Sequence, residues 1–265
     1  MERMSGPQSI HLELSSRCNK SCWMCGRRKM EQELPDLCEW GDMAFPMVEE
    51  IARQIPSGTI VQMHNNGEPT LYPYLGEAML AFSHCVRQFN TNAKLLLENA
   101  NEIMGNLEIL TISVIENDPE GDEQYEIVRE FLRIKGDRSP KLVYRLLGKV
   151  DKEERWCKLP GKIAKRVLHS PDGSRDYRRS VTIPEVGICL DLLTHLAIDR
   201  YGNISLCVRF DPTGELRLGN IDKISLEEAW NGAKRQEYLA KHIGNGRSSC
   251  PGCDKCDFWG IPRGD

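Results

Sequence analysis

One short segment constrains this chain more than any other: Cys18, Cys22 and Cys25 follow one another in the pattern C-x-x-x-C-x-x-C. The segment comes directly after an apolar-alternating run over residues 10–14, which predicts that the cysteines stand at the end of a strand. Three thiols within eight residues cannot all pair as disulfides, but three thiolates can converge on one soft metal centre. A cubane 4Fe–4S cluster has four irons, so three cysteines leave one iron open to an outside ligand. An open position is typical of a reactive metal centre rather than of a closed structural one.

The main alternative for this cysteine triplet is a zinc knuckle, or three unrelated thiols. A structural zinc site takes four ligands. The next cysteine along the chain, Cys38, lies beyond a charged loop that contains Pro35. We therefore favour the iron–sulfur cluster.

A second motif lies downstream, where residues 66–71 read N-G-E-P-T-L after a predicted strand over residues 59–63. The triplet and this segment together resemble the radical S-adenosylmethionine (radical SAM) enzymes, in which a "GGEP" segment closes the second barrel strand. The resemblance implies that Cys18, Cys22 and Cys25 bind a 4Fe–4S cluster. It also implies that S-adenosylmethionine chelates the open iron of that cluster through its amino and carboxylate groups.

The resemblance implies further contacts to S-adenosylmethionine. We expect the N-G-E-P segment to present backbone groups to the methionine ammonium, at Gly67, Glu68 and Pro69. Met24 takes the place of the family's usual aromatic residue before the third cysteine, where the contact to adenine is largely through the backbone. Asn99, after a predicted third strand, and Ser113, in the fourth, are expected contacts to the ribose or the carboxylate. A polar cap at a strand end is the open alternative for both residues.

Alternating strands and helices predict a parallel βα architecture for the first part of the chain. Helices are expected from Pro46, over residues 75–89 and after Gly121. Strands are expected over residues 10–14, 59–63, 94–98, 109–115, 141–147 and 162–169. Six strands are too few for an eight-fold barrel, and the radical SAM family uses a partial, six-stranded barrel. The predicted fold class is therefore α/β: a partial (β/α)6 TIM-like barrel over residues 1–180, followed by a small domain over residues 181–265.

The C-terminal part carries a second group of cysteines, at Cys189, Cys207, Cys250, Cys253 and Cys256. Residues 196–207 predict a hairpin, and residues 225–228 read as a capping box that opens a helix. Residues 187–259 resemble the SPASM/twitch extensions of radical SAM enzymes, whose cysteines hold auxiliary iron–sulfur clusters. Five cysteines fit the shorter twitch form, with one extra cluster.

The resemblance implies that four of these five cysteines bind an auxiliary 4Fe–4S cluster. We predict Cys189, Cys207, Cys253 and Cys256, because the family's terminal C-x-x-C pair lies where this chain continues into Asp-Phe-Trp. Cys250 and Cys253 have the same spacing as Cys253 and Cys256, so spacing alone does not separate them. A zinc ribbon is the alternative, because C-x-x-C pairs are common zinc ligands.

Other residues stand outside these motifs. Arg145 lies near the end of the fifth predicted strand and is a candidate for holding an anionic substrate. Cys157, which follows that strand, is a candidate hydrogen-atom donor. Cys85 is expected to be a core thiol. His64 and His195 are expected to be hydrogen-bonded structural histidines.

Charge and hydropathy exclude several classes of protein. Thirty-five basic and 39 acidic residues give a net charge of −4, without the basic excess of a nucleic-acid-binding surface. No apolar run approaches the length of a membrane span, and the first residues lack the apolar core of a signal peptide. We therefore expect a cytoplasmic protein with no membrane or nucleic-acid partner. Eleven cysteines then favour metal or redox chemistry over disulfides.

The resemblance implies a reaction with one-electron steps. A flavodoxin or ferredoxin-type donor reduces the cluster, S-adenosylmethionine is cleaved, and a 5′-deoxyadenosyl radical takes a hydrogen atom from the substrate. Because an auxiliary cluster can accept the electron left on the substrate, the first hypothesis is oxidation of a small polyol or sugar-like molecule. The alternatives are a peptide-modifying radical SAM enzyme, such as an epimerase or a thioether former, and a non-catalytic iron–sulfur or zinc redox protein.

Overall fold

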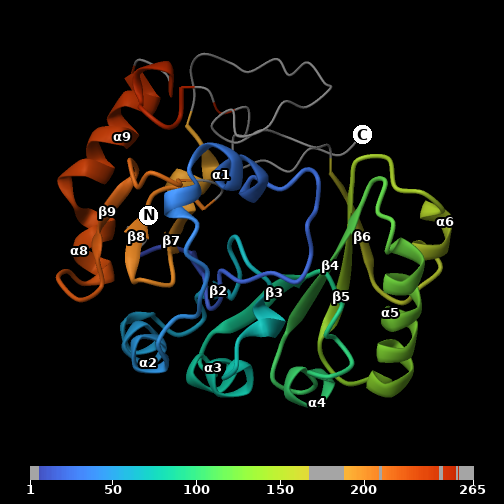
Figure 1. The fold of residues 1–265 in the computed structure, drawn as a ribbon. Coiled ribbons are helices and arrows are strands. Elements are labelled where there is room, and N and C mark those ends of the chain that lie inside the picture. Colours follow the sequence, from blue (N-terminus) through green and yellow to red (C-terminus); the bar gives the residue numbers. More distant parts are fainter. Residues whose placement is uncertain (1–5, 167–187, 209–210, 245–246, 255, 257–265) are drawn as a thin grey trace.

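The computed structural model describes residues 6–166, 188–208, 211–244, 247–254 and 256 of the 265-residue chain. Its strands form one sheet in the order β6-β5-β4-β3-β2-β1-β7-β8-β9 (Figure 1). The bounds of the first six are Ser9–Leu12 (β1), Ile60–Gln62 (β2), Val86–Thr91 (β3), Ile109–Ile115 (β4), Lys141–Leu147 (β5) and Lys162–Arg166 (β6). These six are parallel to their neighbours, as the predicted partial barrel requires.

The C-terminal part extends this same sheet. Its strands are His195–Ile198 (β7), Asn203–Ser205 (β8) and Arg217–Asn220 (β9). β7 pairs in parallel with β1, whereas β7 and β8 form the predicted antiparallel hairpin and β9 pairs antiparallel with β8. The predicted fold class, a parallel α/β partial barrel with a small hairpin-containing C-terminal part, is confirmed. The predicted boundary between residues 180 and 181 lies outside the described residues.

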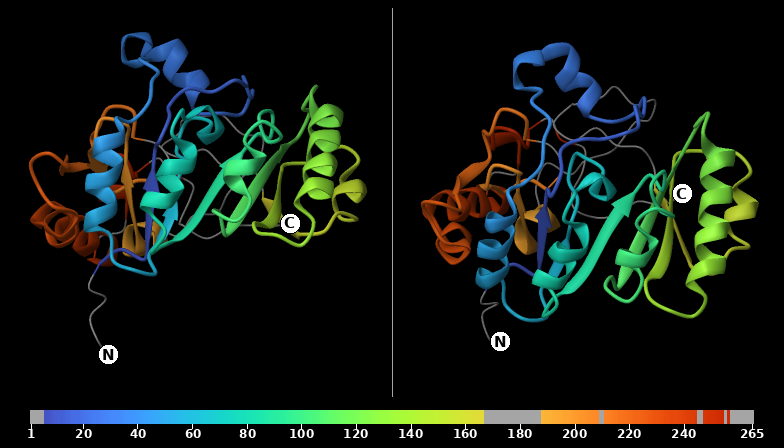
Figure 2. Two further views of the ribbon diagram at one scale, coloured as in Figure 1. Left: turned by 90° about the horizontal axis from the view of Figure 1, so that it is seen from below. Right: turned by 60° about the horizontal axis from the view of Figure 1, so that its bottom comes forward.

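Helices lie along one side of the sheet, and others lie beyond the edge that β9 forms (Figures 1 and 2). Those of the barrel part are Arg27–Glu33 (α1), Phe45–Gln54 (α2), Leu75–Ala81 (α3), Ala100–Ile103 (α4), Gly121–Lys135 (α5) and Glu153–Trp156 (α6). Those of the C-terminal part are Leu190–Thr194 (α7), Leu226–Asn231 (α8) and Ala233–Gly244 (α9). The predicted capping box is present at α8, where Glu228 N–H donates to the Ser225 hydroxyl over 3.1 Å. No helix in the described part of the chain combines the length and the apolar character needed to cross a membrane.

The two faces of the sheet differ in chemistry, because side chains alternate along each strand. One face packs against the helices and is apolar and buried, with Ile10, Val61, Phe89, Leu110, Ile112, Leu142 and Tyr144. By the strand register, the opposite face carries Ser9, His11, Gln62, Gln88, Asn90, Ser113, Arg145 and His195. We call this second set the polar face. A buried apolar face and a polar face fix the register of the strands and leave a polar surface on one side of the sheet.

The sequence analysis was wrong about the third strand. It continued a helix through Val86 and Phe89 and placed the strand at residues 94–98. Instead α3 ends at Ala81, β3 covers Val86–Thr91, and residues 94–99 form turns. Side chains of β3 alternate between half-buried and buried, which is the two-residue period of a strand. Ala93 then adopts φ +68°, a left-handed conformation that ends the extended chain.

Candidate functional site

The cysteine triplet lies in the loop between β1 and α1. Cys18, Cys22 and Cys25 are free and half-buried, and the Cys25 N–H donates to the Cys22 carbonyl over 3.1 Å. Burial, together with the nearby Cys25 and Cys18 thiols, raises the pKa of Cys22 to about 12. The three thiols are therefore neighbours that repel one another as thiolates. A positively charged metal centre would remove this repulsion, which fits a cluster site, and binding would release protons.

The N-G-E-P segment packs against the base of this loop. The Glu68 N–H donates to the Arg17 carbonyl over 2.7 Å. At Gly67, a Cβ atom would lie 2.0 Å from the Ser15 carbonyl oxygen, so a side chain cannot be accommodated there without movement. Glycine is thus required where the second strand meets the triplet loop, because the two backbones approach closely there. The contact of Gly67 to S-adenosylmethionine stays a prediction.

Replacing Gly67 with alanine is expected to displace the triplet loop. Overpacking of this kind typically costs about 1–3 kcal/mol of folding stability. Thermal unfolding of the metal-free protein and iron assays after reconstitution would measure the effect. Gly244→Ala is the matched control, because among the described residues no atom outside its own helix backbone and chain neighbours lies within 4 Å of a Cβ built there. Equal unfolding temperatures and iron contents for the two variants would show that Gly67 is not needed for packing.

The buried Glu68 carboxylate connects the N-G-E-P segment to the end of β3 through hydrogen bonds. It is 2% exposed, and it accepts hydrogen bonds from the Thr91 hydroxyl at 2.7 Å and the Asn92 N–H at 2.8 Å. Thr70 donates to it through both its hydroxyl and its N–H. Burial raises the pKa of Glu68, and these hydrogen bonds oppose the shift. The side chain ties the segment to the end of β3, which leaves the backbone of residues 67–69 for the predicted contact to S-adenosylmethionine.

Asn92, which follows β3, is a residue that the sequence analysis missed. Its Nδ2 donates to Asn19 Oδ1 over 2.8 Å and lies 4.0 Å from Cys18 Sγ. Asn99, predicted to follow the third strand, instead precedes α4 and donates to the Leu95 carbonyl over 2.9 Å. The reason given for assigning Asn99 a contact was therefore wrong. The alternation along β3 was the signal that would have pointed to Asn92.

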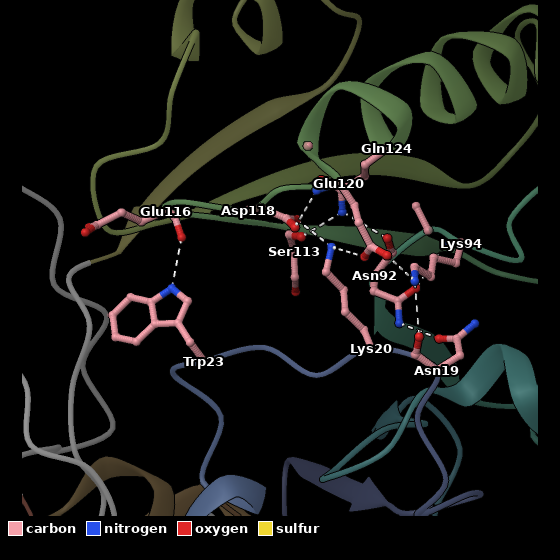
Figure 3. Close-up of polar contacts among 12 residues, drawn as sticks. Asn19, Lys20, Trp23, Asn92, Lys94, Ser113, Glu116, Asp118, Glu120 and Gln124 are labelled. Carbon is pink, nitrogen blue, oxygen red and sulfur yellow. Dashed lines mark hydrogen bonds and ion pairs between the residues drawn. The ribbon is translucent and has the colours of Figure 1, made fainter.

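The remaining predicted contacts lie at the same end of the sheet or along its polar face. The Ser113 carbonyl in β4 accepts a hydrogen bond from Gln124 Nε2 over 3.0 Å (Figure 3). Met24 is half-buried within the triplet loop. Arg145 pairs in register with Ser113 and is half-buried on the polar face, whereas Cys157 is exposed just after α6. The roles assigned to these residues stay predictions.

Three expectations about other residues are confirmed. Cys85 is a buried core thiol. His64 Nδ1 accepts a hydrogen bond from the Asn90 N–H over 3.2 Å, and His195 Nδ1 lies 2.6 Å from the Thr194 hydroxyl. Both histidines are thus hydrogen-bonded, as structural histidines are.

The second cysteine group gathers beside the hairpin. Burial raises the pKa of Cys253, and Cys207, Cys256 and Cys189 raise it further in that order, ahead of Cys250. These four thiols come from the start of α7, the end of β8 and the C-terminal turns. No three His, Cys, Asp or Glu side chains in the described part of the chain are arranged to hold a single metal ion. As a set of soft thiol donors, the group fits an iron–sulfur cluster.

Cys250 differs from the other four. It is 0% exposed and lies within an apolar cluster with Leu192, Leu206, Leu216 and Tyr238, whereas Cys189, Cys207 and Cys253 are only partly buried against that same cluster. Its carbonyl accepts the Cys253 N–H over 3.0 Å, which makes the turn that carries the next cysteine. Its packing favours a structural role, although its assignment as the spare cysteine remains a prediction.

Buried polar groups hold the segment around Cys189. The Cys189 N–H donates to Nδ1 of His242, which is 0% exposed. Arg235 stacks on Trp230 and donates to the Leu192 carbonyl over 3.0 Å. Burial lowers the pKa of Arg235 to about 10. These contacts tie α7, which follows Cys189, to α8 and α9.

A cavity of about 300 Å³ lies between the two halves of the chain, and Cys207 is part of its wall. Glu13, at the end of β1, also lines it and is 5% exposed. The Glu13 carboxylate accepts the Asn66 N–H over 3.2 Å and the Arg200 N–H over 3.4 Å. Burial raises the pKa of Glu13. This side chain therefore links the second-strand segment to the C-terminal hairpin.

Residues 189–257 match the SPASM family, an iron–sulfur cluster-binding domain. The fold is similar to that of BtrN in complex with AdoMet and 2-DOIA, with 17% identity, a TM-score of 0.64, and coverage of 100% of this chain and 98% of that chain. No curated protein matches the sequence.

Structures of SuiB from Streptococcus suis are also similar. The S-adenosylmethionine-bound form has 14% identity and a TM-score of 0.65, over 96% of this chain and 72% of that chain. The form bound to the precursor peptide SuiA has 14% identity and a TM-score of 0.66, over 96% and 71%. At these identities the structural similarity shows the fold alone. The SPASM match covers residues 189–257, in the C-terminal part of the chain.

Proposed function

We propose that this chain, a radical SAM enzyme with a SPASM domain, oxidises a small polyol or sugar-like substrate and uses an auxiliary cluster as electron acceptor. The observation that carries the proposal is the presence of two separate thiol groups on one sheet. The first follows β1, and the second includes Cys207 after β8, two strands away. A site for starting a radical reaction and a site for accepting an electron are what such an oxidation requires.

The chain holds the cofactors with a distinct set of residues at each site. Cys18, Cys22 and Cys25 would bind one 4Fe–4S cluster, and Cys189, Cys207, Cys253 and Cys256 the other. When bound, the clusters and S-adenosylmethionine supply hydrogen-atom abstraction and one-electron transfer. The backbone of residues 67–69 would orient the methionine end, close to the triplet. A flavodoxin or ferredoxin-type protein would deliver the electron.

The polar face supports a hydroxyl-rich substrate. It carries hydroxyl, amide and imidazole groups, together with the guanidinium of Arg145. Amides such as those of Gln62 and Asn90 both donate and accept hydrogen bonds, as the hydroxyl groups of a polyol do. The similarity to BtrN, which was crystallised with 2-DOIA, covers nearly the whole of both chains and supports the same choice.

Peptide modification is the second candidate function. The fold similarity to SuiB, crystallised with the precursor peptide SuiA, has a comparable TM-score. The two candidates differ in what the polar face would bind: hydroxyl groups of a small ring or chain, or a peptide backbone.

Presenting both substrate classes to the reconstituted, reduced enzyme would separate the two functions. We expect polyols and aminocyclitols to stimulate 5′-deoxyadenosine formation and to yield a product lighter by two hydrogens, detected by mass spectrometry. Arg145→Gln removes a guanidinium that could donate to substrate hydroxyl groups, so it should raise KM for a polyol and leave the cleavage of S-adenosylmethionine without substrate unchanged. Turnover of peptides only would contradict the polyol assignment. An enzyme that forms no 5′-deoxyadenosine under any condition would favour a redox relay.

A further inference from the structure

Lys20 lies inside the triplet, between Cys18 and Cys22, yet its side chain is only 7% exposed. Its Nζ atom is 2.5 Å from Asp118 Oδ2 and 3.3 Å from Glu120 Oε2 (Figure 3). The Asp118 side chain is 5% exposed and comes from the turn between β4 and α5, 98 residues further along the chain. A lysine in a surface loop normally extends into water. Here it forms a buried ion pair that joins the triplet loop to the end of β4.

A second set of contacts holds the residue before it. Asn19 Oδ1 accepts from Asn92, and the Asn19 carbonyl accepts from Lys94 Nζ over 3.2 Å. Lys94 in turn lies 2.5 Å from Glu120 Oε1. Two lysines and two carboxylates thus form one electrically balanced network, whose members point toward one another in Figure 3. The network fastens the segment between the first two cysteines to the ends of β3 and β4.

The segment between the second and third cysteines is held on the same side. Trp23 Nε1 donates to the Glu116 carbonyl, at the end of β4, over 3.1 Å. The loop is therefore fastened through side chains that lie between the cysteines, while the three thiols stay available to a metal centre. Lys20 stands two residues from both Cys18 and Cys22, so its buried ammonium belongs to the same short loop as the thiols.

We propose that Lys20 is a positioning residue: its ion pair with Asp118 preforms the triplet loop before metal binds, and its ammonium offsets the negative charge of Asp118 beside the thiolates. The second effect rests on the proposed function, because it requires a cluster at the triplet. A positive charge close to an iron–sulfur cluster favours its reduced form, since net charge is one of the factors that set the potential. The protein would thus favour the electron-accepting step through a residue that binds no iron.

The loop is tested first in the metal-free protein, by hydrogen–deuterium exchange over residues 18–25. Lys20→Met is expected to speed exchange there at least about tenfold, because a buried partner charge is left unpaired. Lys20→Arg keeps the ion pair and should exchange like the wild type. Lys29→Met is the control, because Lys29 pairs with Glu33 on the surface of α1 at 3.4 Å. Unchanged exchange in Lys20→Met would overturn the preformed loop, whatever the triplet binds.

The charge effect is tested by redox titration of the reconstituted proteins, monitored by electron paramagnetic resonance. The triplet cluster should have a lower potential in Lys20→Met. It should return toward the wild-type value in Lys20→Met/Asp118→Asn, where the local charge is balanced again. Equal potentials in the wild type and Lys20→Met would overturn this part. Failure of the wild type to bind a triplet cluster would instead count against the proposed function, and would leave the exchange result standing.

Discussion

Replacing Cys18, Cys22 and Cys25 together with alanine is expected to halve the iron content and to abolish cleavage of S-adenosylmethionine. The wild type should bind about eight irons in two cubane clusters, and the variant about four in the auxiliary cluster. Without an open iron, S-adenosylmethionine has no site for chelation and no source of the electron. Anaerobic reconstitution followed by iron assay, and chromatography of 5′-deoxyadenosine after dithionite reduction, would measure both effects.

The control for this variant removes cysteines that lie in neither group. Cys38→Ala/Cys157→Ala should keep the full iron content, because Cys38 is half-buried next to α1 and Cys157 is exposed after α6. If the triple variant and the wild type release 5′-deoxyadenosine at the same rate, the triplet is not the catalytic centre. Stoichiometric zinc together with four irons in the wild type would contradict the auxiliary cluster.

In the second cysteine group, Cys253→Ala and Cys256→Ala are expected to lose the auxiliary cluster, and Cys250→Ala to keep it. The thiols of Cys207, Cys256, Cys189 and Cys250 all raise the pKa of Cys253, so the choice of four ligands rests on the family resemblance. Cys250 is 0% exposed, and as the spare thiol its truncation should cost only about 1 kcal/mol as a small buried cavity. Loss of a cluster ligand removes folding free energy as well as iron. Iron counts, electron paramagnetic resonance and thermal unfolding of the three variants would separate these outcomes.

The opposite pattern would revise the ligand set. If Cys250→Ala loses the cluster while Cys256→Ala keeps it, then Cys250 is the fourth ligand. The apolar contacts of Cys250 would then be the wall of the cluster site rather than part of the core. Cys85→Ala, which also truncates a buried thiol, is the control for the effect of a cavity alone on unfolding.

Much of the fold could be predicted from periodicity. The apolar run of β4 and the alternation of β5 coincide with the predicted ranges 109–115 and 141–147. β3 could not be assigned in the same way, because Val86 and Phe89 also fit the spacing of the preceding helix. What separates the two elements is the end of α3 at Ala81 and the left-handed Ala93, both of which depend on tertiary packing.

The cysteines of the site could be found because ligand spacing is local. The partners of the triplet loop could not, because Lys20 meets Asp118 and Asn19 meets Asn92 only after distant strands are aligned. Nothing in the local sequence signals that the Lys20 side chain is buried.

The pairing of β7 with β1 joins the two halves of the chain in one hydrogen-bonded sheet. β1, which carries the triplet loop, is hydrogen-bonded along both edges, to β2 and to β7. Pulling the C-terminal part away would turn β1 into an edge strand, so both halves should unfold in one cooperative transition. Strands in a sheet are about 4.8 Å apart, and β7 alone lies between β1 and β8, so these two strands are roughly 10 Å apart. If clusters occupy both thiol groups, the hydrogen-bonded sheet, rather than a hinge, would fix the distance over which the electron moves.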